Sequence, residues 1–338
     1  MQTYNPEFVE NSEYAYAVAR IRALETGLIT EMGYNSLISA PRERFHSLFS
    51  EVSGIRWEGS SDVHTVLENL EESFTQQFFL VKSLIVEDEL KWLISLKYDY
   101  ELLKLIVKDE TGEQISVPSA LSLRSNFSFP FLKVFLENGN FGETGETMYN
   151  AYISLKTRGE KNGGSIDYVC DCAYYADLFS ILDFYRNPFV TGYFVQRIDT
   201  ANVLAALRLK ARGEKRSAIR ERFVPFGTIG LHHLEAGFDV NLDGFADRIQ
   251  FSPLSSVFRK TDKKKEQEEQ LIEIEKLCDE QLLRYLRESI FVTFGVEPVL
   301  SYLWIKEAEL QNLRVILLAK ESGIAQDEIK KYIRGANV

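Results

Sequence analysis

The chain has 338 residues, of which 45% are hydrophobic and 26% charged, and its formal net charge is -11. This length indicates two or three domains or an array of similar units, and the acidic balance argues against nucleic acid as a partner. Three cysteines cannot all pair, and no run of 18 uncharged apolar residues occurs, so we expect a cytoplasmic protein without a disulfide framework or a transmembrane segment.

Hydrophobic residues near the N-terminus recur at helical spacing. In residues 14–29, Val18, Ile21, Leu24 and Leu28 follow one another at intervals of three or four residues, which places them on one helix face. The same periodicity continues through residues 70–85 and along most of the chain, whereas alternation with period two is scarce. The sequence therefore predicts an all-α fold.

Two later segments carry the same signals for a long helix. They are NPFVTGYFVQRIDTANVLAALRLKARG at residues 187–213 and EPVLSYLWIKEAELQNLRVILLAKESG at residues 297–323. In each, a proline suits the first helical turn, and a glycine suits the position after the last turn. Matching positions lie 110 residues apart: Pro188, Asp199, Asn202, Lys210 and Gly213 correspond to Pro298, Glu309, Asn312, Lys320 and Gly323. The constant offset indicates an internal repeat.

A weaker first copy of the long helix contains Asp99 and ends at Gly112, with Leu102 in place of the asparagine. Three copies at intervals of about 110 residues predict three helical lobes, at residues 1–116, 117–223 and 224–338. On a buried face, Asn202 and Asn312 could bond to a neighbouring helix and fix its register, together with the acid three residues earlier. We favour this packing role over a ligand or catalytic site.

The segment RLKARGEKRSAIRER is strongly basic within an acidic protein. Its fifteen residues include seven basic ones, Arg208, Lys210, Arg212, Lys215, Arg216, Arg220 and Arg222. A solvated helix face is the usual explanation for such a run. The alternative hypothesis is a face that meets an acidic partner surface or lipid headgroups.

The segment FDVNLDGFADRIQ matches the first half of a calcium-binding loop. Asp239, Asn241 and Asp243 occupy the first three ligand positions, but position 12 is Gln250, which cannot supply the usual bidentate carboxylate. We favour an Asx turn without a metal, and a weak calcium site is the alternative. The chain has no G-x-x-x-x-G-K-[ST] loop, and we predict no catalytic residue, cofactor or small-molecule substrate.

Three parts of the chain carry a family resemblance. The closing segment EPVLSYLWIKEAELQNLRVILLAKESGIAQDEIKKYIRG resembles the C-terminal signature of the C subunit of V/A-type rotary ATPases, the counterpart of the d subunit of vacuolar ATPases. The opening YAYAVARIRALETGLIT is similar to the N-terminal helix of that family, and YFVQRIDTANVLAALRLKARG is similar to its middle signature. Leu102 and residues 236–265 depart from the family pattern.

The resemblance implies an all-helical, pseudo-threefold, funnel-shaped protein that is peripheral to the membrane on its cytoplasmic side. Such subunits are non-catalytic parts of the rotor, and they join the central shaft to the membrane ring of proteolipids for ATP-linked transport of protons or sodium ions. The shaft subunits and the ring would then be the partners. From the residues alone, the alternative is an independent helical-repeat scaffold, regulated by calcium, that binds peptides in a concave groove.

Overall fold

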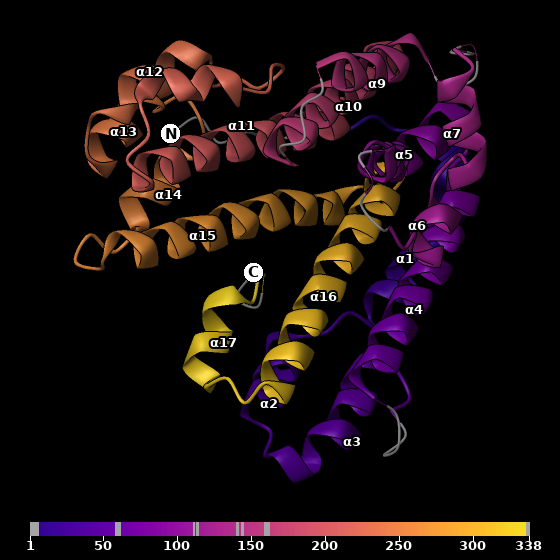
Figure 1. Ribbon diagram of the computed structural model, residues 1–338. Helices are drawn as coiled ribbons and strands as arrows, with labels where there is room; N and C mark the ends of the chain where they lie inside the picture. The colour runs from indigo at the N-terminus through magenta and orange to yellow at the C-terminus, as the bar shows by residue number, and fades with distance from the viewer. Residues whose placement is uncertain are drawn as a thin grey trace.

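The computed structural model describes residues 7–57, 62–110, 112, 115–139, 142, 145–158 and 163–335. All regular secondary structure in these residues is helical, which confirms the predicted all-α fold. The six longest helices in these residues have 21 to 25 residues each. They are α4 (Val63–Leu84), α5 (Asp88–Glu110), α10 (Gly163–Tyr185), α11 (Pro188–Ala211), α15 (Gln267–Arg287) and α16 (Glu297–Glu321) (Figure 1).

Shorter helices occupy the segments between the long ones. Those before α10 are η1 (Ser12–Tyr14), α1 (Ala15–Glu25), α2 (Glu31–Ser39), α3 (Arg42–Ser53), α6 (Ser119–Arg124), α7 (Phe129–Glu137) and α9 (Glu146–Arg158). Those after α11 are η2 (Arg216–Glu221), α12 (Leu231–Phe238), α13 (Leu242–Arg248), α14 (Ser255–Lys260), η3 (Glu288–Phe291) and α17 (Gln326–Tyr332). They pack against the long helices or connect them (Figure 1).

The long helices are paired in cyclic order. Along the chain they come as three consecutive pairs, α4 with α5, α10 with α11, and α15 with α16. In space, the second helix of each pair packs against the first helix of another pair: α5 against α10, α11 against α15, and α16 against α4 (Figure 1). The last pair therefore closes onto the first, and each predicted lobe contains one consecutive pair.

The two ends of the chain lie together in this closure. Helix α16 packs against α1 and α2 in addition to α4, and α17 contacts α2, α15 and α16. The end of the predicted third lobe is thus bound to the beginning of the first.

The repeated helices begin and end with similar local structures. Asn187 caps α11 by accepting a hydrogen bond from the Val190 N–H at 2.9 Å, and Pro188 is the first helical residue. Pro298 is the second residue of α16. After each helix, Gly213 and Gly323 adopt positive φ angles of 72° and 71°, a left-handed conformation that costs glycine little.

The buried apolar side chains form two cores. The larger core runs through all three helix pairs, from Tyr14 near the N-terminus to Ile333 near the C-terminus. The smaller core lies between the second half of α11, helices α12–α14 and the first half of α15. The outer part of this one arm therefore has a core of its own.

Candidate functional site

The residues just before α5 and α11 and the first residue of α16 come together at a junction, which we call the vertex and define by Glu87, Asn187 and Glu297. Asn187 and Glu297 are buried, and Glu87 is half-buried. The Asn187 Nδ2 donates to Glu297 Oε1 at 2.9 Å, and the Val9 N–H donates to the same oxygen at 3.0 Å. The Tyr185 hydroxyl donates to Glu87 Oε1 at 3.4 Å. Because helix N-termini carry partial positive charge, carboxylates are stabilised where these helices begin.

Exposed apolar side chains surround the vertex. Phe184, in the last turn of α10 before α11, is 74% exposed, and Phe291, at the end of η3 before α16, is 78% exposed. The full set, which we call the vertex patch, is Val9, Val86, Phe184, Ile290, Phe291 and Phe294. Large exposed apolar groups gathered in one region are typical of an interaction surface.

Just beyond the vertex, α16 touches both α5 and α11, and we call these three the inner helices. Tyr193 of α11 stacks on Trp304 of α16 with ring centroids 4.1 Å apart, and Lys97 of α5 forms an ion pair with Glu307 of α16. Burial opposes ionisation of Glu307, but Lys97 and Arg197 outweigh burial and lower the pKa of this carboxyl. These three charged residues occupy equivalent positions of the repeat, because Arg197 follows Lys97 by 100 residues and Glu307 follows Arg197 by 110. Equivalent positions of the three inner helices therefore lie close together near the vertex.

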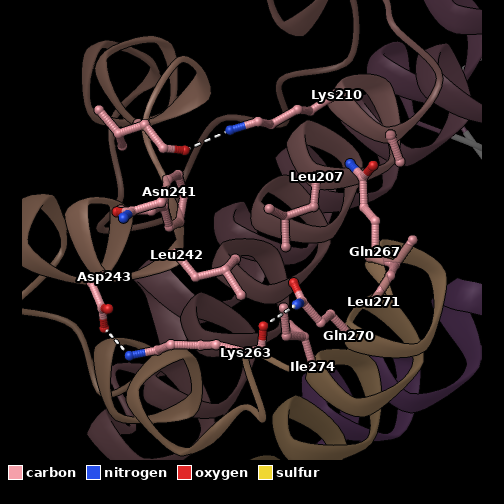
Figure 2. A pocket seen from close by; sticks show the side chains of 14 residues that line it. Leu207, Lys210, Asn241, Leu242, Asp243, Lys263, Gln267, Gln270, Leu271 and Ile274 are labelled. Atoms are coloured by element: carbon pink, nitrogen blue, oxygen red, sulfur yellow. Dashed lines mark hydrogen bonds and ion pairs between the residues drawn. The ribbon is translucent and has the colours of Figure 1, made fainter. Parts of the chain in front are cut away.

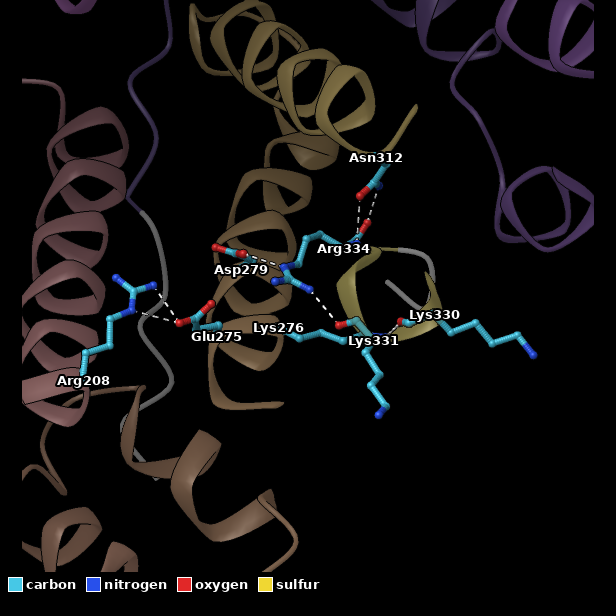
Figure 3. Close-up of polar contacts among 8 residues, drawn as sticks. All are labelled: Arg208, Glu275, Lys276, Asp279, Asn312, Lys330, Lys331 and Arg334. Atoms are coloured by element: carbon cyan, nitrogen blue, oxygen red, sulfur yellow. Dashed lines mark hydrogen bonds and ion pairs between the residues drawn. The ribbon is translucent and has the colours of Figure 1, made fainter. Parts of the chain in front are cut away.

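The two mid-helix asparagines make the same pair of hydrogen bonds. Asn202 donates to the Val224 carbonyl and accepts from the Val224 N–H, both at 2.8 Å. Asn312 donates to the Arg334 carbonyl at 2.7 Å and accepts from the Arg334 N–H at 2.9 Å (Figure 3). In each case the partner is 22 residues further along the chain. Both partners are loop residues, whereas the sequence pattern predicted a bond to a neighbouring helix.

The acids three residues before these asparagines bind loop backbone too. The Ile229 N–H donates to Asp199 at 2.8 Å, and the Ile29 N–H donates to Glu309 at 2.8 Å. In the first copy, the Asn126 N–H donates to Asp99 at 2.7 Å. Burial raises the pKa of Asp99 to about 7, although hydrogen bonds from Asn126 oppose that rise.

The repeated lysines also bind equivalent carbonyls. Lys210 donates to the Val240 carbonyl at 2.5 Å, just after α12, and Lys320 donates to the Ala40 carbonyl at 2.8 Å, just after α2. The backbone of residues 229 and 240 therefore binds the acid and the lysine of α11, and the backbone of residues 29 and 40 binds the acid and the lysine of α16. The loop groups that bind the C-terminal copy of the helix thus come from the N-terminal part of the chain.

Ion pairs between the paired long helices were not predicted from the sequence. Lys104 of α5 binds Asp171 of α10 at 2.9 Å, and Arg314 of α16 binds Glu71 of α4 at 2.6 Å. The position in α11 that is equivalent to Lys104 and Arg314 is Leu204, which carries no charge. The acid of α15 that is equivalent to Asp171 is Asp279, and it binds Arg334 at 2.8 Å instead (Figure 3). The dipeptide Cys-Asp occurs at residues 170–171 and again at residues 278–279, and this repetition is the feature of the sequence that points to Asp171 and Asp279 as equivalent acids.

The predicted basic segment is largely bound to its own chain. Arg208 pairs with Glu275 at 2.7 Å (Figure 3), Arg216 with Asp239 at 3.4 Å, and Arg220 with Glu235 at 2.5 Å. For Arg212, Lys215 and Arg222, the described residues provide no carboxylate at ion-pair distance, and all three side chains are exposed. The segment thus keeps free positive charge on the surface.

The calcium-like residues do not converge on one point. Asp239 pairs with Arg216, Asp243 pairs with Lys263, and Asn241 caps α13 by accepting from the Gly244 N–H at 2.9 Å. Residues 242–248 are helical, whereas a calcium loop would need to wrap around the ion. In the described parts of the chain, no three His, Cys, Asp or Glu residues are grouped to hold a metal ion.

No helix in the described residues combines enough length with enough apolar character to cross a bilayer.

The sequence is similar to the sequences of known proteins from one family. A family model described as ATP synthase (C/AC39) subunit matches residues 17–332. The chain is 23% identical to the A-type ATP synthase C subunit of Methanococcoides burtonii, over 96% of this chain and 94% of that protein. It is 24% identical to the A-type ATP synthase C subunit of Haloquadratum walsbyi, over 96% and 99%. The V-type sodium ATPase C subunit of Enterococcus hirae is 20% identical, over 79% and 81%.

Proposed function

The chain belongs to the ATP synthase (C/AC39) subunit family, and on this premise we propose that it joins the central shaft of a V/A-type ATPase to the membrane proteolipid ring. Its relatives are named as C subunits of such enzymes, and these subunits are non-catalytic. The rotor would transmit torque between ATP chemistry in the head and transport of protons or sodium ions through the ring. The protein would sit on the cytoplasmic side, peripheral to the membrane.

The cyclic pairing of the long helices is the observation that carries this proposal. A pseudo-threefold funnel would have three equivalent walls, and the pairings of α5 with α10, α11 with α15 and α16 with α4 support this arrangement. Near the vertex, α16 contacts α11 through Trp304 and Tyr193 and contacts α5 through Glu307 and Lys97. Further from the vertex, an ion pair joins each inner helix to the long helix beside it. The helices would therefore diverge from the vertex, as the wall of a funnel does.

Stiffness is the property that torque transmission needs. A wall that bent under load would store the work of rotation without passing it on. The hydrogen bonds of Asn202 and Asn312 tie α11 and α16 to loops, and closure of α16 onto α4 removes a free end. Buried bonds of this kind are costly to break, which supports a rigid coupling element.

The vertex patch suits the ring side of the proposed rotor. Its side chains are apolar and exposed, and they lie near the residues where the three inner helices begin, which would be the narrow end of the funnel. The wide end, formed by the second halves of the helices, would then receive the shaft. No described helix enters the membrane under this arrangement.

Purification of the tagged chain from its native membranes in mild detergent tests the proposal. We expect the proteolipid, the shaft subunits and ATPase activity to be recovered with it. Recovery of the chain alone from the soluble fraction would overturn the rotor function and favour the independent scaffold.

Charge at the vertex patch tests which end meets the ring. Phe184→Glu with Phe291→Glu should lower recovery of the proteolipid at least about tenfold, because buried anchor residues dominate interface energy. Val134→Glu is the matched control, since Val134 is 51% exposed on α7, outside the patch. Equal recovery from both variants would show that the ring binds elsewhere.

A further inference from the structure

A pocket lies at the far end of α11, enclosed by the last turn of that helix, the turn between α12 and α13, and the start of α15. Its cavity volume is about 400 Å³. Figure 2 shows Leu207, Leu242, Leu271 and Ile274 around its centre, with polar groups at the rim. This volume and this mostly apolar lining are typical of pockets that bind a ligand or an anchor side chain.

The rim of the pocket is held by bonds that the chain makes with itself. On one side Lys210 donates to the Val240 carbonyl at 2.5 Å, and on the other Lys263 pairs with Asp243 (Figure 2). The Gln270 amide donates to the Lys265 carbonyl at 2.8 Å and holds the loop before α15. The opening is therefore preformed, and its three leucines, at positions 207, 242 and 271, remain partly exposed.

Two strongly basic segments border this pocket. Residues 208–222 contain seven basic and two acidic residues, and residues 259–265 contain five basic residues and one acid, in a chain of net charge -11. Both contribute lining residues, Lys210 and Ala211 from the first and Lys263 from the second. Throughout the described residues, no carboxylate lies at ion-pair distance from the exposed Arg212, Lys215, Lys260 or Lys264.

We propose that this pocket binds an acidic amphipathic helix of a partner protein, which inserts apolar anchor side chains between the two basic segments. An apolar hollow flanked by cations is complementary to a helix whose apolar stripe is flanked by carboxylates. The charges would steer the helix to the site, and the anchors would supply most of the affinity.

A protein helix fits better than a membrane lipid. The pocket lies about 30 Å along α11 from the vertex, at 1.5 Å per residue, and therefore away from the side assigned to the ring. This preference for protein over lipid rests on the proposed function. The pocket and its unpaired charges do not depend on it.

Binding of a synthetic helix to the full chain tests the inference. The probe is a fluorescein-labelled peptide of Glu, Ala and Leu, with the leucines on one helical face, and fluorescence anisotropy reports binding. We expect saturable binding that weakens with added salt. Ala211→Trp fills the mouth of the pocket from an exposed position and should weaken binding at least about tenfold. Arg212→Glu with Lys264→Glu should weaken it similarly, because charge complementarity is reversed.

Matched controls separate this site from general electrostatic attraction. Arg42→Glu with Arg44→Glu changes the same charge on α3, outside the pocket, and should leave binding unchanged. A peptide of the same composition with its leucines spread around the helix should bind at least about tenfold more weakly. Equal binding of the two peptides, equal loss in both charge variants, or no binding to the wild-type chain would overturn the inference. Binding to anionic phosphatidylglycerol vesicles but not to the peptide would overturn it in favour of a lipid site.

Discussion

At the scale of single residues, the repeated polar side chains satisfy loop backbone. A loop that packs inside a protein carries N–H and C=O groups that need partners. Asn202 and Asn312 each satisfy one residue completely, because an amide side chain both donates and accepts. This explains why an asparagine occurs at equivalent positions of two long helices, where leucine would be a better helix former.

Replacing Asn312 with leucine should therefore destabilise the protein by about 1–3 kcal/mol, because the Arg334 N–H and C=O lose their partners. Urea unfolding followed by circular dichroism measures the change. Gln311→Leu is the control, since Gln311 is exposed and should shift the unfolding free energy little. An Asn312→Leu midpoint equal to that of the wild type would show that the two bonds contribute nothing.

Asp99 predicts a pH dependence of stability. Its folded pKa of about 7 exceeds the unfolded value of about 3.9, so the folded state holds an extra proton between these values. Its contribution to the free energy of unfolding therefore falls as pH rises to about 7, by up to about 1.4 kcal/mol per pH unit, and is constant above. Unfolding of wild type and Asp99→Asn from about pH 5 to about pH 8 measures the difference. Parallel pH curves would contradict this assignment.

At the scale of helices, the ends are decided by a few local groups. Asn187 and Pro188 start α11, and left-handed glycines follow α11 and α16. The Glu214 N–H bonds the Leu209 carbonyl at 3.0 Å, and the Ile324 N–H bonds the Ala319 carbonyl at 2.9 Å. These are matching Schellman closures, and they turn the chain away at the same point of each repeat.

Gly323→Ala should cost about 1 kcal/mol, because alanine is strained at positive φ. No heavy atom lies within 4 Å of an added Cβ there, so the loss would report backbone strain alone. Thermal unfolding compares it with Gly27→Ala, whose φ is not in the left-handed region and whose Cβ would lie 3.4 Å from the Leu24 carbonyl oxygen. A larger loss at Gly27 than at Gly323 would contradict this explanation.

At the scale of the whole molecule, closure of the helix pairs joins distant parts of the chain. The Ile29 N–H and the Glu309 carboxylate are 280 residues apart in sequence and 2.8 Å apart in space. The larger core runs through all three pairs, whereas helices α12–α14 share the smaller core with parts of α11 and α15. The molecule therefore has one common centre and one partly independent outer arm.

Hydrogen exchange followed by mass spectrometry should separate these two parts. Amides of α12, α13 and α14 are expected to exchange faster than those in the first half of α16, because short helices on a small core open locally at lower cost. The vertex end of α16 is buried on nearly every side, from Glu297 to Trp304. Equal protection of the two regions would show that the outer arm unfolds only with the whole molecule.

The sequence by itself determined the helical class, the family and the positions that repeat, because periodicity, caps and glycine terminators act within a few residues of the chain. Asn202, Asn312 and Gly323 could be singled out on those grounds. The tertiary structure alone decided that α16 closes onto α4, that both asparagines bind loops, and that Asp279 turns to Arg334 where Leu204 replaces a cation. It also separated the calcium-like ligands, since Asp239 and Asp243 pair with Arg216 and Lys263. These outcomes depend on which distant segments come together in space, which local sequence patterns do not encode.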